Sequence, residues 1–139
     1  MITNILLIED DINLNTILAD YLRSKEYVVE TAVDGQEGWE LISKKHFDII
    51  LSDIMMPNMN GWQFLKSLRD ANNSTPLIFI SAKSDREDII KGYQLGCDDY
   101  VTKPFSVREL MARIKANLRK FEMGTGAEVP VANKASKKI

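Results

Sequence analysis

The sequence predicts an α/β protein, a doubly wound five-stranded parallel sheet with flanking helices. Short apolar runs recur without polar alternation, which is typical of strands covered on both faces. Segments with helical spacing of apolar residues lie between these runs. The length of 139 residues suits one domain with a single core. Alternating strands and helices favour a parallel sheet wound on both sides.

The first half of the chain shows this alternation clearly. A strand at Ile5–Ile8 precedes a helix, and a second strand follows at about 28–32. Asp34 and Glu37 have the spacing of a capping box, so a second helix is expected after Asp34. The first helix is expected to bury one face, formed by Leu14, Ile17, Leu18, Tyr21 and Leu22.

Three more strands are expected in the second half. The run 48–52 stops at Asp53, a helix follows near 61–69, and further strands are expected at 77–80 and 100–102. Two Ser-x-x-Glu spacings predict capping boxes for the last two helices. Those pairs are Ser84 with Glu87, and Ser106 with Glu109. The last helix is expected to present an apolar side and to end near Met123-Gly124; the side is formed by Leu110, Met111, Ile114, Leu118 and Phe121.

Composition narrows the class of protein. A formal net charge of −2 and a pI near 5.4 argue against a broad basic face that holds nucleic acid. A single cysteine, Cys97, cannot form an internal disulfide, and no apolar stretch or leader predicts a membrane span or secretion. We therefore expect a cytoplasmic protein without a membrane partner. Residues 1–122 are expected to form the domain, and residues 123–139 to be a linker or tail.

Chemically reactive side chains follow four of the five strands. They are Glu9 and Asp10 after the first strand, Asp53 after the third, Ser81 after the fourth and Lys103 after the fifth. Ligands of open α/β sheets bind outside the carboxyl ends of the strands, so all five are expected at one edge. Any one acid there is more often a helix cap or a solvated residue, and Asp11 and Asp34 fit that role. The five together predict a site.

Three neighbouring carboxylates repel one another, so positive charge must balance them. A divalent cation and Lys103 could supply it. Oxygen ligands suit Mg²⁺, and no cluster of His or Cys supports zinc. A carboxylate beside Mg²⁺ and an ammonium can attack a phosphoryl group, because both cations stabilise the charge that develops on its oxygens. Asp53 is the candidate nucleophile.

Four segments carry a resemblance to a known family: ILLIEDD, DIILSDIMMPNMNG, PLIFISAKSD and GCDDYVTKPFSVRELMARIKANLRK. In this order they resemble the receiver domain of two-component response regulators, from about Asn4 to Lys120. The resemblance implies a flavodoxin-like, receiver-like fold. It also implies a phosphoacceptor signalling domain that promotes only its own phosphotransfer and dephosphorylation and is otherwise no enzyme.

The resemblance implies a role for each residue of the site. Asp53 would accept a phosphoryl group from a sensor histidine kinase. Asp10 and Asp53 would bind Mg²⁺ through carboxylates and Met55 through its backbone carbonyl, with Glu9 acting through a metal-bound water. Lys103 would pair with Asp53 and then with the phosphoryl group, and its bond to the following proline, Pro104, is cis in the family.

The resemblance also implies a two-state switch. Ser81 would turn its hydroxyl to the phosphoryl oxygen, and Tyr100 would move inward into the vacated space. The commoner residue at the position of Ser81 is Thr, so the loss of a methyl group could loosen the coupling.

The final segment resembles the OmpR/PhoB class, whose receivers dimerise through the fourth helix, fifth strand and fifth helix. Ile89 departs from this pattern, because many members carry a basic residue there that faces the acid at the position of Glu109. In that class a winged-helix DNA-binding domain follows the receiver and controls transcription. This chain is too short to contain one, so it is expected to be an excised receiver or a stand-alone one. The implied dimer residues are Lys91, Asp98, Asp99, Glu109, Arg113 and Arg119.

The same features allow three other interpretations of the function. A flavin-binding flavodoxin needs a phosphate-binding loop after the first strand, where this chain has three acids. A Mg²⁺-dependent phosphohydrolase usually carries Asp-x-Asp, whereas Asp53 is followed by Ile54-Met55. A docking module that acts only through its surface is compatible with the sequence. The lone histidine, His46, is given no catalytic role.

Overall fold

The structure is a computed structural model that describes residues 2–126, with side chains through residue 121. The chain divides into two units, Met1–Phe105 and Ser106–Ile139. Among the described residues, none of the helices combines the length and the apolar character that crossing a membrane requires.

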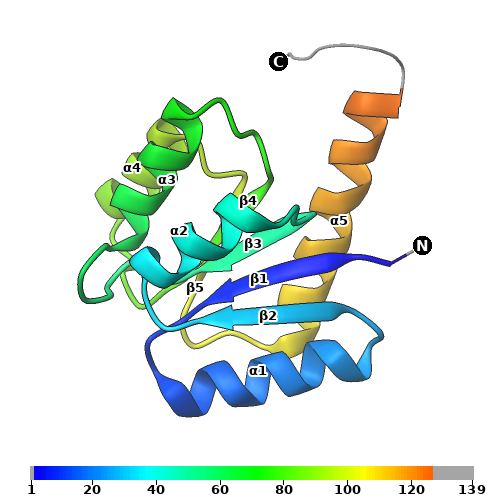
Figure 1. Cartoon of the computed structure of the whole chain (residues 1–139). Helices are drawn as coiled ribbons and strands as arrows, with labels where there is room; N and C mark the ends of the chain where they lie inside the picture. Colours follow the sequence, from blue (N-terminus) through cyan, green and yellow to red (C-terminus); the bar gives the residue numbers. More distant parts are fainter. Residues whose placement is uncertain (1, 127–139) are drawn as a thin grey trace. The chain divides into compact units, whose positions relative to one another are not determined.

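The first unit contains a five-stranded sheet with strand order β2-β1-β3-β4-β5, in which every pair is parallel (Figure 1). This confirms the predicted α/β fold. Its strands are β1 (Asn4–Ile8), β2 (Val28–Ala32), β3 (Ile49–Ser52), β4 (Leu77–Ser81) and β5 (Asp99–Thr102). Its helices are α1 (Ile12–Ser24), α2 (Gly35–Lys44), α3 (Gly61–Asp70) and α4 (Arg86–Leu95).

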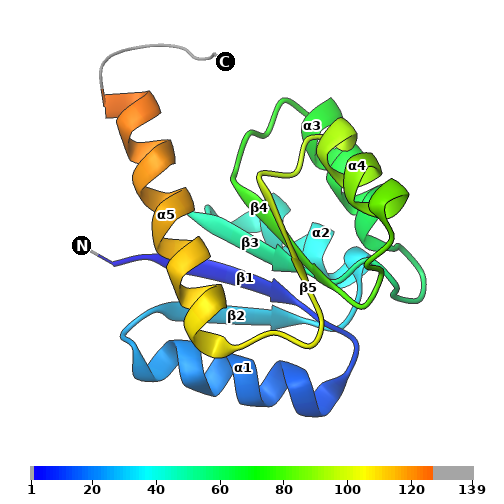
Figure 2. The ribbon, with the colours of Figure 1, turned by 180° about the vertical axis from the view of Figure 1, so that it is seen from behind.

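Helices α2, α3 and α4 cover one face of the sheet and α1 lies on the opposite face (Figures 1 and 2). Successive side chains of a strand point to opposite faces. Leu6 and Ile8 of β1 belong to the core cluster beneath α2, α3 and α4, so Ile5 and Leu7 point the other way. All four are fully buried. The apolar runs lack polar alternation because helices cover both faces.

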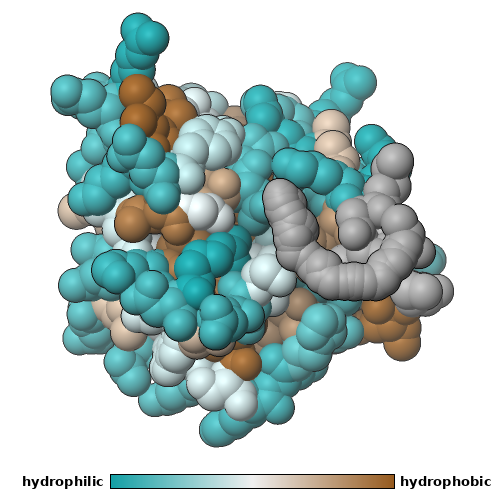
Figure 3. Space-filling view, turned by 90° about the horizontal axis from the view of Figure 1, so that it is seen from above, coloured by the Kyte–Doolittle hydropathy of each residue, from teal (hydrophilic) through white to brown (hydrophobic). Residues whose placement is uncertain are grey.

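The core beneath α2, α3 and α4 combines aliphatic and aromatic side chains. Phe64 of α3 and Phe79 of β4 are fully buried, and the ring of Phe64 meets that of Trp39 edge to face at 6.1 Å between centroids. Cys97 is also buried in this cluster. Trp39, Met56, Met59 and Trp62 are partly buried against it, so these side chains contribute to the packing. Figure 3 shows that hydrophobic residues on the face seen from above form separate patches among hydrophilic ones.

The predicted buried face of α1 is partly wrong. The structure buries Asn15, Leu18, Ala19 and Leu22, whereas the side chain of Ile17 is 65% exposed. The amide of Asn15 donates to the backbone oxygens of Glu9 and Ala32 at 3.0 and 3.2 Å. Because these hydrogen bonds satisfy its polar group, Asn15 can occupy a buried position that a search for apolar residues overlooks.

Two acids cap helices as expected. Asp11 accepts from the N–H of Leu14, and Asp34 accepts from the N–H of Glu37 at 2.8 Å. The capping box at Asp34 is incomplete, because the Glu37 side chain accepts from the N–H of Val33 instead. A complete box occurs at α3, between Asn60 and Gln63.

The predicted box of Ser84 and Glu87 is wrong. Helix α4 begins at Arg86 with Asp85 as its N-cap residue. Glu87 is therefore the second helical residue, and a capping box needs its acid at the third. The third position belongs to Asp88, whose carboxylate lies 4.0 Å from the ammonium of Lys83.

The second unit is helix α5 (Val107–Gly126). Ser106 accepts a hydrogen bond from the N–H of Glu109 at 3.0 Å, which agrees with the predicted start. The helix runs past the predicted end near Met123-Gly124. Glycine lowers helix propensity by about 1 kcal/mol relative to alanine but keeps its N–H, so one glycine need not end a helix. The predicted tail thus begins within the helix, and its residues 127–139 lie outside the described part of the chain.

Candidate functional site

The carboxyl ends of the central strands lie at one edge of the sheet. The register aligns Ile8 of β1 with Ser52 of β3, and Ser81 of β4 with Thr102 of β5. The residues that follow these ends are therefore neighbours in space although they are distant in sequence. All five side chains predicted for the site belong to the first unit, and the acids and the lysine meet there.

Three carboxylates form the centre of the site. Ligand oxygens of Glu9, Asp10 and Asp53 all lie within 4.8 Å of one another. Glu9 and Asp53 are buried, and Asp10 is exposed to solvent. A donor set made only of oxygen and open to water fits Mg²⁺, which keeps several of its own waters when it binds proteins.

Lys103 connects two of these carboxylates. Its ammonium donates to Oε1 of Glu9 and to Oδ2 of Asp53, each at 2.9 Å. Both bonds are charge-assisted, and they place one positive charge between two buried negative ones. The peptide bond from Lys103 to Pro104 is cis, as the resemblance implied.

For both Glu9 and Lys103, burial and ion pairing shift the pKa in opposite directions. Burial raises the pKa of Glu9, while the hydrogen bonds from Lys103 and from the N–H of Asp11 partly offset that rise. For Lys103, burial acts to lower the pKa, but the hydrogen bonds to Glu9 and Asp53 outweigh it and the pKa is raised. The ammonium is therefore charged at neutral pH.

The loop that follows β3 is fixed close to Asp53. Oδ1 of Asp53 accepts from the N–H of Ile54 at 2.6 Å, and the N–H of Gly61 donates to the oxygen of Ile54 at 2.8 Å. A Cβ atom on Gly61 would lie 2.2 Å from the backbone oxygen of Asp53, so only glycine fits where α3 begins. Met55 lies in this loop two residues after Asp53, with its side chain 58% exposed.

Ser81 and Tyr100 both contact the backbone of Lys83. The hydroxyl of buried Ser81 accepts from the N–H of Lys83 at 3.1 Å, and the hydroxyl of Tyr100 donates to its carbonyl at 2.6 Å. The Tyr100 ring is already inside, 7% exposed and edge to face with Phe79. Burial raises the pKa of Tyr100 to about 12. The two expected switch residues therefore both form hydrogen bonds with the backbone of Lys83, in the β4–α4 loop.

The residues expected at a dimer surface have contacts within this chain. The carboxylate of Asp98 accepts from Arg69 at 3.1 Å, and that of Asp99 accepts from the N–H of Tyr100 at 2.9 Å. The ammonium of Lys91 lies 3.9 Å from the centroid of the Trp62 ring.

Two further predicted dimer positions lie on α5, where Glu109 and Arg113 pair within the helix at 3.3 Å. Arg119 is exposed. Ile89, the departure from the class, is partly buried against the core cluster of the first unit.

Sequence reasoning missed one contact that joins two loops. Asn58 in the β3–α3 loop donates to Asp34 at 2.6 Å, although Asp34 was expected only as a helix cap. The signal available in the sequence was the Pro57-Asn58 pair, which indicates a turn but does not identify a distant partner.

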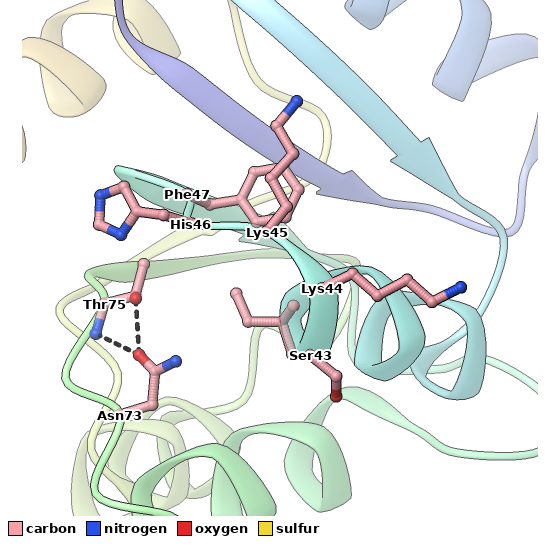
Figure 4. A pocket seen from close by; sticks show the side chains of 8 residues that line it. Ser43, Lys44, Lys45, His46, Phe47, Asn73 and Thr75 are labelled. Atoms are coloured by element: carbon pink, nitrogen blue, oxygen red, sulfur yellow. Dashed lines mark hydrogen bonds between the residues drawn. The ribbon is translucent and has the colours of Figure 1, made fainter.

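One cavity of about 360 Å³ lies elsewhere, next to the segments that precede β3 and β4 (Figure 4). It is lined by Lys44 at the end of α2, by Lys45, His46 and Phe47 after it, and by Asn73 and Thr75 before β4. These segments enter the strands at their amino ends, so the cavity is not part of the acidic site. His46 is exposed there and lies 3.3 Å from Asp48.

The fold and the site together define a class of protein. It is a flavodoxin-like α/β protein whose β1–α1 loop carries acids in place of a phosphate-binding loop, with a lysine placed between two of the site's carboxylates. The response regulator receiver domain matches residues 5–115, most of the described chain. The chain belongs to the family of response regulator receiver domains.

Named relatives agree with this family. The chain is 45% identical over 116 residues to the transcriptional regulatory protein RprY of Bacteroides fragilis, covering 84% of this chain and 49% of RprY. It is 42% identical over 118 residues to the response regulator ArlR of Staphylococcus aureus, covering 85% of this chain and 53% of ArlR. The chain thus spans about half the length of these curated relatives.

Solved structures show the same fold. The receiver domain of the Francisella response regulator 1452 has a TM-score of 0.82 at 34% identity, with 86% of this chain and 98% of that chain covered. A CheY-like receiver domain from Methanospirillum hungatei has a TM-score of 0.84 at 27% identity, with 88% and 98% covered.

Proposed function

We propose that this domain accepts a phosphoryl group from a sensor histidine kinase on Asp53, in a reaction that depends on Mg²⁺. The observation that carries the proposal is the ammonium of Lys103, 2.9 Å from both Asp53 and Glu9 within the cluster of three acids. Membership of the receiver family supports the same chemistry.

The proposed transfer forms one bond to phosphorus and breaks one. A carboxylate oxygen of Asp53 bonds to phosphorus while the bond between phosphorus and the kinase histidine nitrogen breaks, and the histidine keeps that electron pair. Lys103 lies where it can balance negative charge on the phosphoryl oxygens. Asp10, Asp53 and the carbonyl of Met55 would hold Mg²⁺, with Glu9 acting through a metal-bound water, and the ion when bound supplies further positive charge for the phosphoryl oxygens.

We further propose that Ser81 and Tyr100 change their contacts when Asp53 is phosphorylated. If the hydroxyl of Ser81 turns to a phosphoryl oxygen, it leaves the N–H of Lys83, to which it is now bonded. The hydroxyl of Tyr100 donates a hydrogen bond to the carbonyl of Lys83. Phosphorylation is thus expected to change the β4–α4 loop first, because both contacts end on Lys83.

The output is also a proposal. The name of RprY includes transcriptional regulation, and we propose that the parent protein of this domain controls transcription through a DNA-binding domain outside this chain. Dimerisation through α4, β5 and α5 would use the residues expected from the sequence, among them Lys91, Asp99 and Arg113. The cytoplasmic location expected from the sequence stays a prediction.

The test is the intact mass of the chain after incubation with acetyl phosphate and Mg²⁺. We expect one phosphoryl adduct in the wild type and in Asp70→Asn, which changes an exposed acid on α3. No adduct is expected in Asp53→Asn or with a chelator. An adduct that persists in Asp53→Asn would identify another acceptor. Absence of any adduct with both acetyl phosphate and histidine kinases would favour a module that acts without phosphorylation.

A further inference from the structure

Two hydrogen bonds connect the β3–α3 loop to the residues at the start of α2. The side-chain amide of Asn58 donates to Oδ2 of Asp34 at 2.6 Å, and the N–H of Gly35 donates to the carbonyl oxygen of Met59 at 2.9 Å. Asp34 and Gly35 follow β2, whereas Asn58 and Met59 follow β3. These two hydrogen bonds join segments that are 24 residues apart in the sequence.

The carboxylate of Asp34 serves two segments at once. Oδ1 accepts from the N–H of Glu37 at 2.8 Å and caps α2, and Oδ2 accepts from Asn58. The side chain is almost fully buried. The N–H of Glu37 and the amide of Asn58 both lower the pKa of Asp34, so the group stays charged at neutral pH. A buried carboxylate with two strong donors keeps its position.

The backbone at this contact has little freedom. Asn58 has a φ of 66°, in the left-handed region. A Cβ atom on Gly35 would lie 2.4 Å from the oxygen of Met59, so the two backbones pack directly on each other. Met59 also packs against the core cluster. The hydrogen bond between Asp34 and Asn58 therefore restrains the end of the loop that precedes α3.

The near end of the same loop contains Asp53 and Met55. We propose that Asp34 is a positioning residue: through Asn58 it fixes residues 53–60 so that the Met55 carbonyl and the carboxylates of the site bind Mg²⁺ together. This inference rests on the proposed function. Without the contact, the loop populates other conformations, and the apparent dissociation constant for Mg²⁺ rises by the inverse of the fraction that stays competent. We expect a rise of about 5- to 10-fold.

The experiment is calorimetric titration of the intact chain with Mg²⁺ alone. Asp34→Ser keeps an oxygen that caps α2 but removes the partner of Asn58. Asn58→Gly removes the amide and still allows the positive φ. Each variant is expected to weaken Mg²⁺ binding about 5- to 10-fold, and the double variant no more than either alone, because both changes break the same contact.

Ser106→Ala is the matched control. It removes a helix-capping hydrogen bond, from the N–H of Glu109, that touches no part of the β3–α3 loop. Its Mg²⁺ affinity is expected to stay within about twofold of the wild type while its melting temperature falls, as for any lost cap. Circular dichroism of each variant verifies that it is folded before titration.

The outcomes separate this inference from the proposed function. Wild-type Mg²⁺ affinity in folded Asp34→Ser and Asn58→Gly, with only a lower melting temperature, would show a purely structural contact and overturn the inference alone. Additive losses in the double variant would also overturn it, because the two side chains would then act separately. If the wild type itself bound no Mg²⁺, the metal-dependent function and the inference would fail together.

Discussion

Replacing Lys103 by methionine removes the ammonium between two buried carboxylates while keeping a side chain of similar length. Loss of one hydrogen bond to a charged group costs about 1.5–3 kcal/mol. Two are lost here, to Glu9 and Asp53. The Lys103 side chain is 21% exposed, so water compensates in part. We therefore take the lower limit for each bond, about 3 kcal/mol in total.

This loss of stability should be visible in thermal unfolding. For a chain of 139 residues the unfolding entropy is roughly 0.3 kcal/mol/K, so the Tm of Lys103→Met is expected to fall by about 10 °C near neutral pH. The assay is differential scanning calorimetry in the presence of a chelator, so that bound cations do not contribute.

Lys66→Met is the control, because the Lys66–Asp70 pair is also short, at 2.8 Å, but both side chains are about two-thirds exposed. Exposed ion pairs contribute little to stability, so the Tm of Lys66→Met is expected to stay within about 2 °C of the wild type. Similar small shifts in the two variants would refute the argument that the charge on Lys103 stabilises buried carboxylates.

The pH dependence gives a second check on the same variant. Burial raises the pKa of Glu9 and Lys103 opposes that rise, so removing Lys103 raises the pKa further. A group whose pKa is raised by folding adds stability below its unfolded value and loses that contribution as the pH rises through its folded value. The deficit in Tm is therefore expected to shrink from about pH 7.5 to about pH 5. A deficit independent of pH would contradict this assignment.

One further variant tests the packing beside Asp53, and one chemical probe tests the buried core cluster that contains Cys97. Gly61→Ala places a Cβ atom 2.2 Å from the backbone oxygen of Asp53, and the backbone can move aside only at a high energetic cost. We expect the free energy of unfolding, measured in urea, to fall by more than about 2 kcal/mol. A stability within experimental error of the wild type would contradict that contact. Burial raises the pKa of Cys97 to about 12, so its thiol is expected to react with a disulfide reagent near pH 8 only after unfolding. Rapid labelling of the folded chain would show that the thiol is accessible.

The acidic site was predictable because it follows from strand topology. Once five apolar runs are assigned to a parallel sheet, the residues after each run must meet at one edge, and Glu9, Asp53 and Lys103 do. No side-chain detail was needed for this step. The choice of candidate metal ligands then depended only on residue type and on position after a strand.

The interactions that were not predicted are those whose partners are distant and not implied by topology. Asn15 is buried because two backbone oxygens accept from it, one just after β1 and one at the end of β2, and periodicity treats it as a polar residue facing solvent. Asn58 and Asp34 are each explained locally, by a turn and a cap, and neither local rule indicates their contact. A one-residue error in the start of α4 was enough to invalidate the box at Ser84.

The bond between Lys103 and Glu9 joins residues 94 positions apart. Contacts between distant residues require the closure of long loops and tend to form late in folding. A chain in which β1 and β3 have already paired, but β5 has not yet docked, holds Glu9, Asp10 and Asp53 together without the ammonium that offsets their repulsion. The last strand therefore adds the charge that stabilises residues placed by the first and third. A chain in which β5 has not docked therefore lacks the ammonium that the proposed site uses.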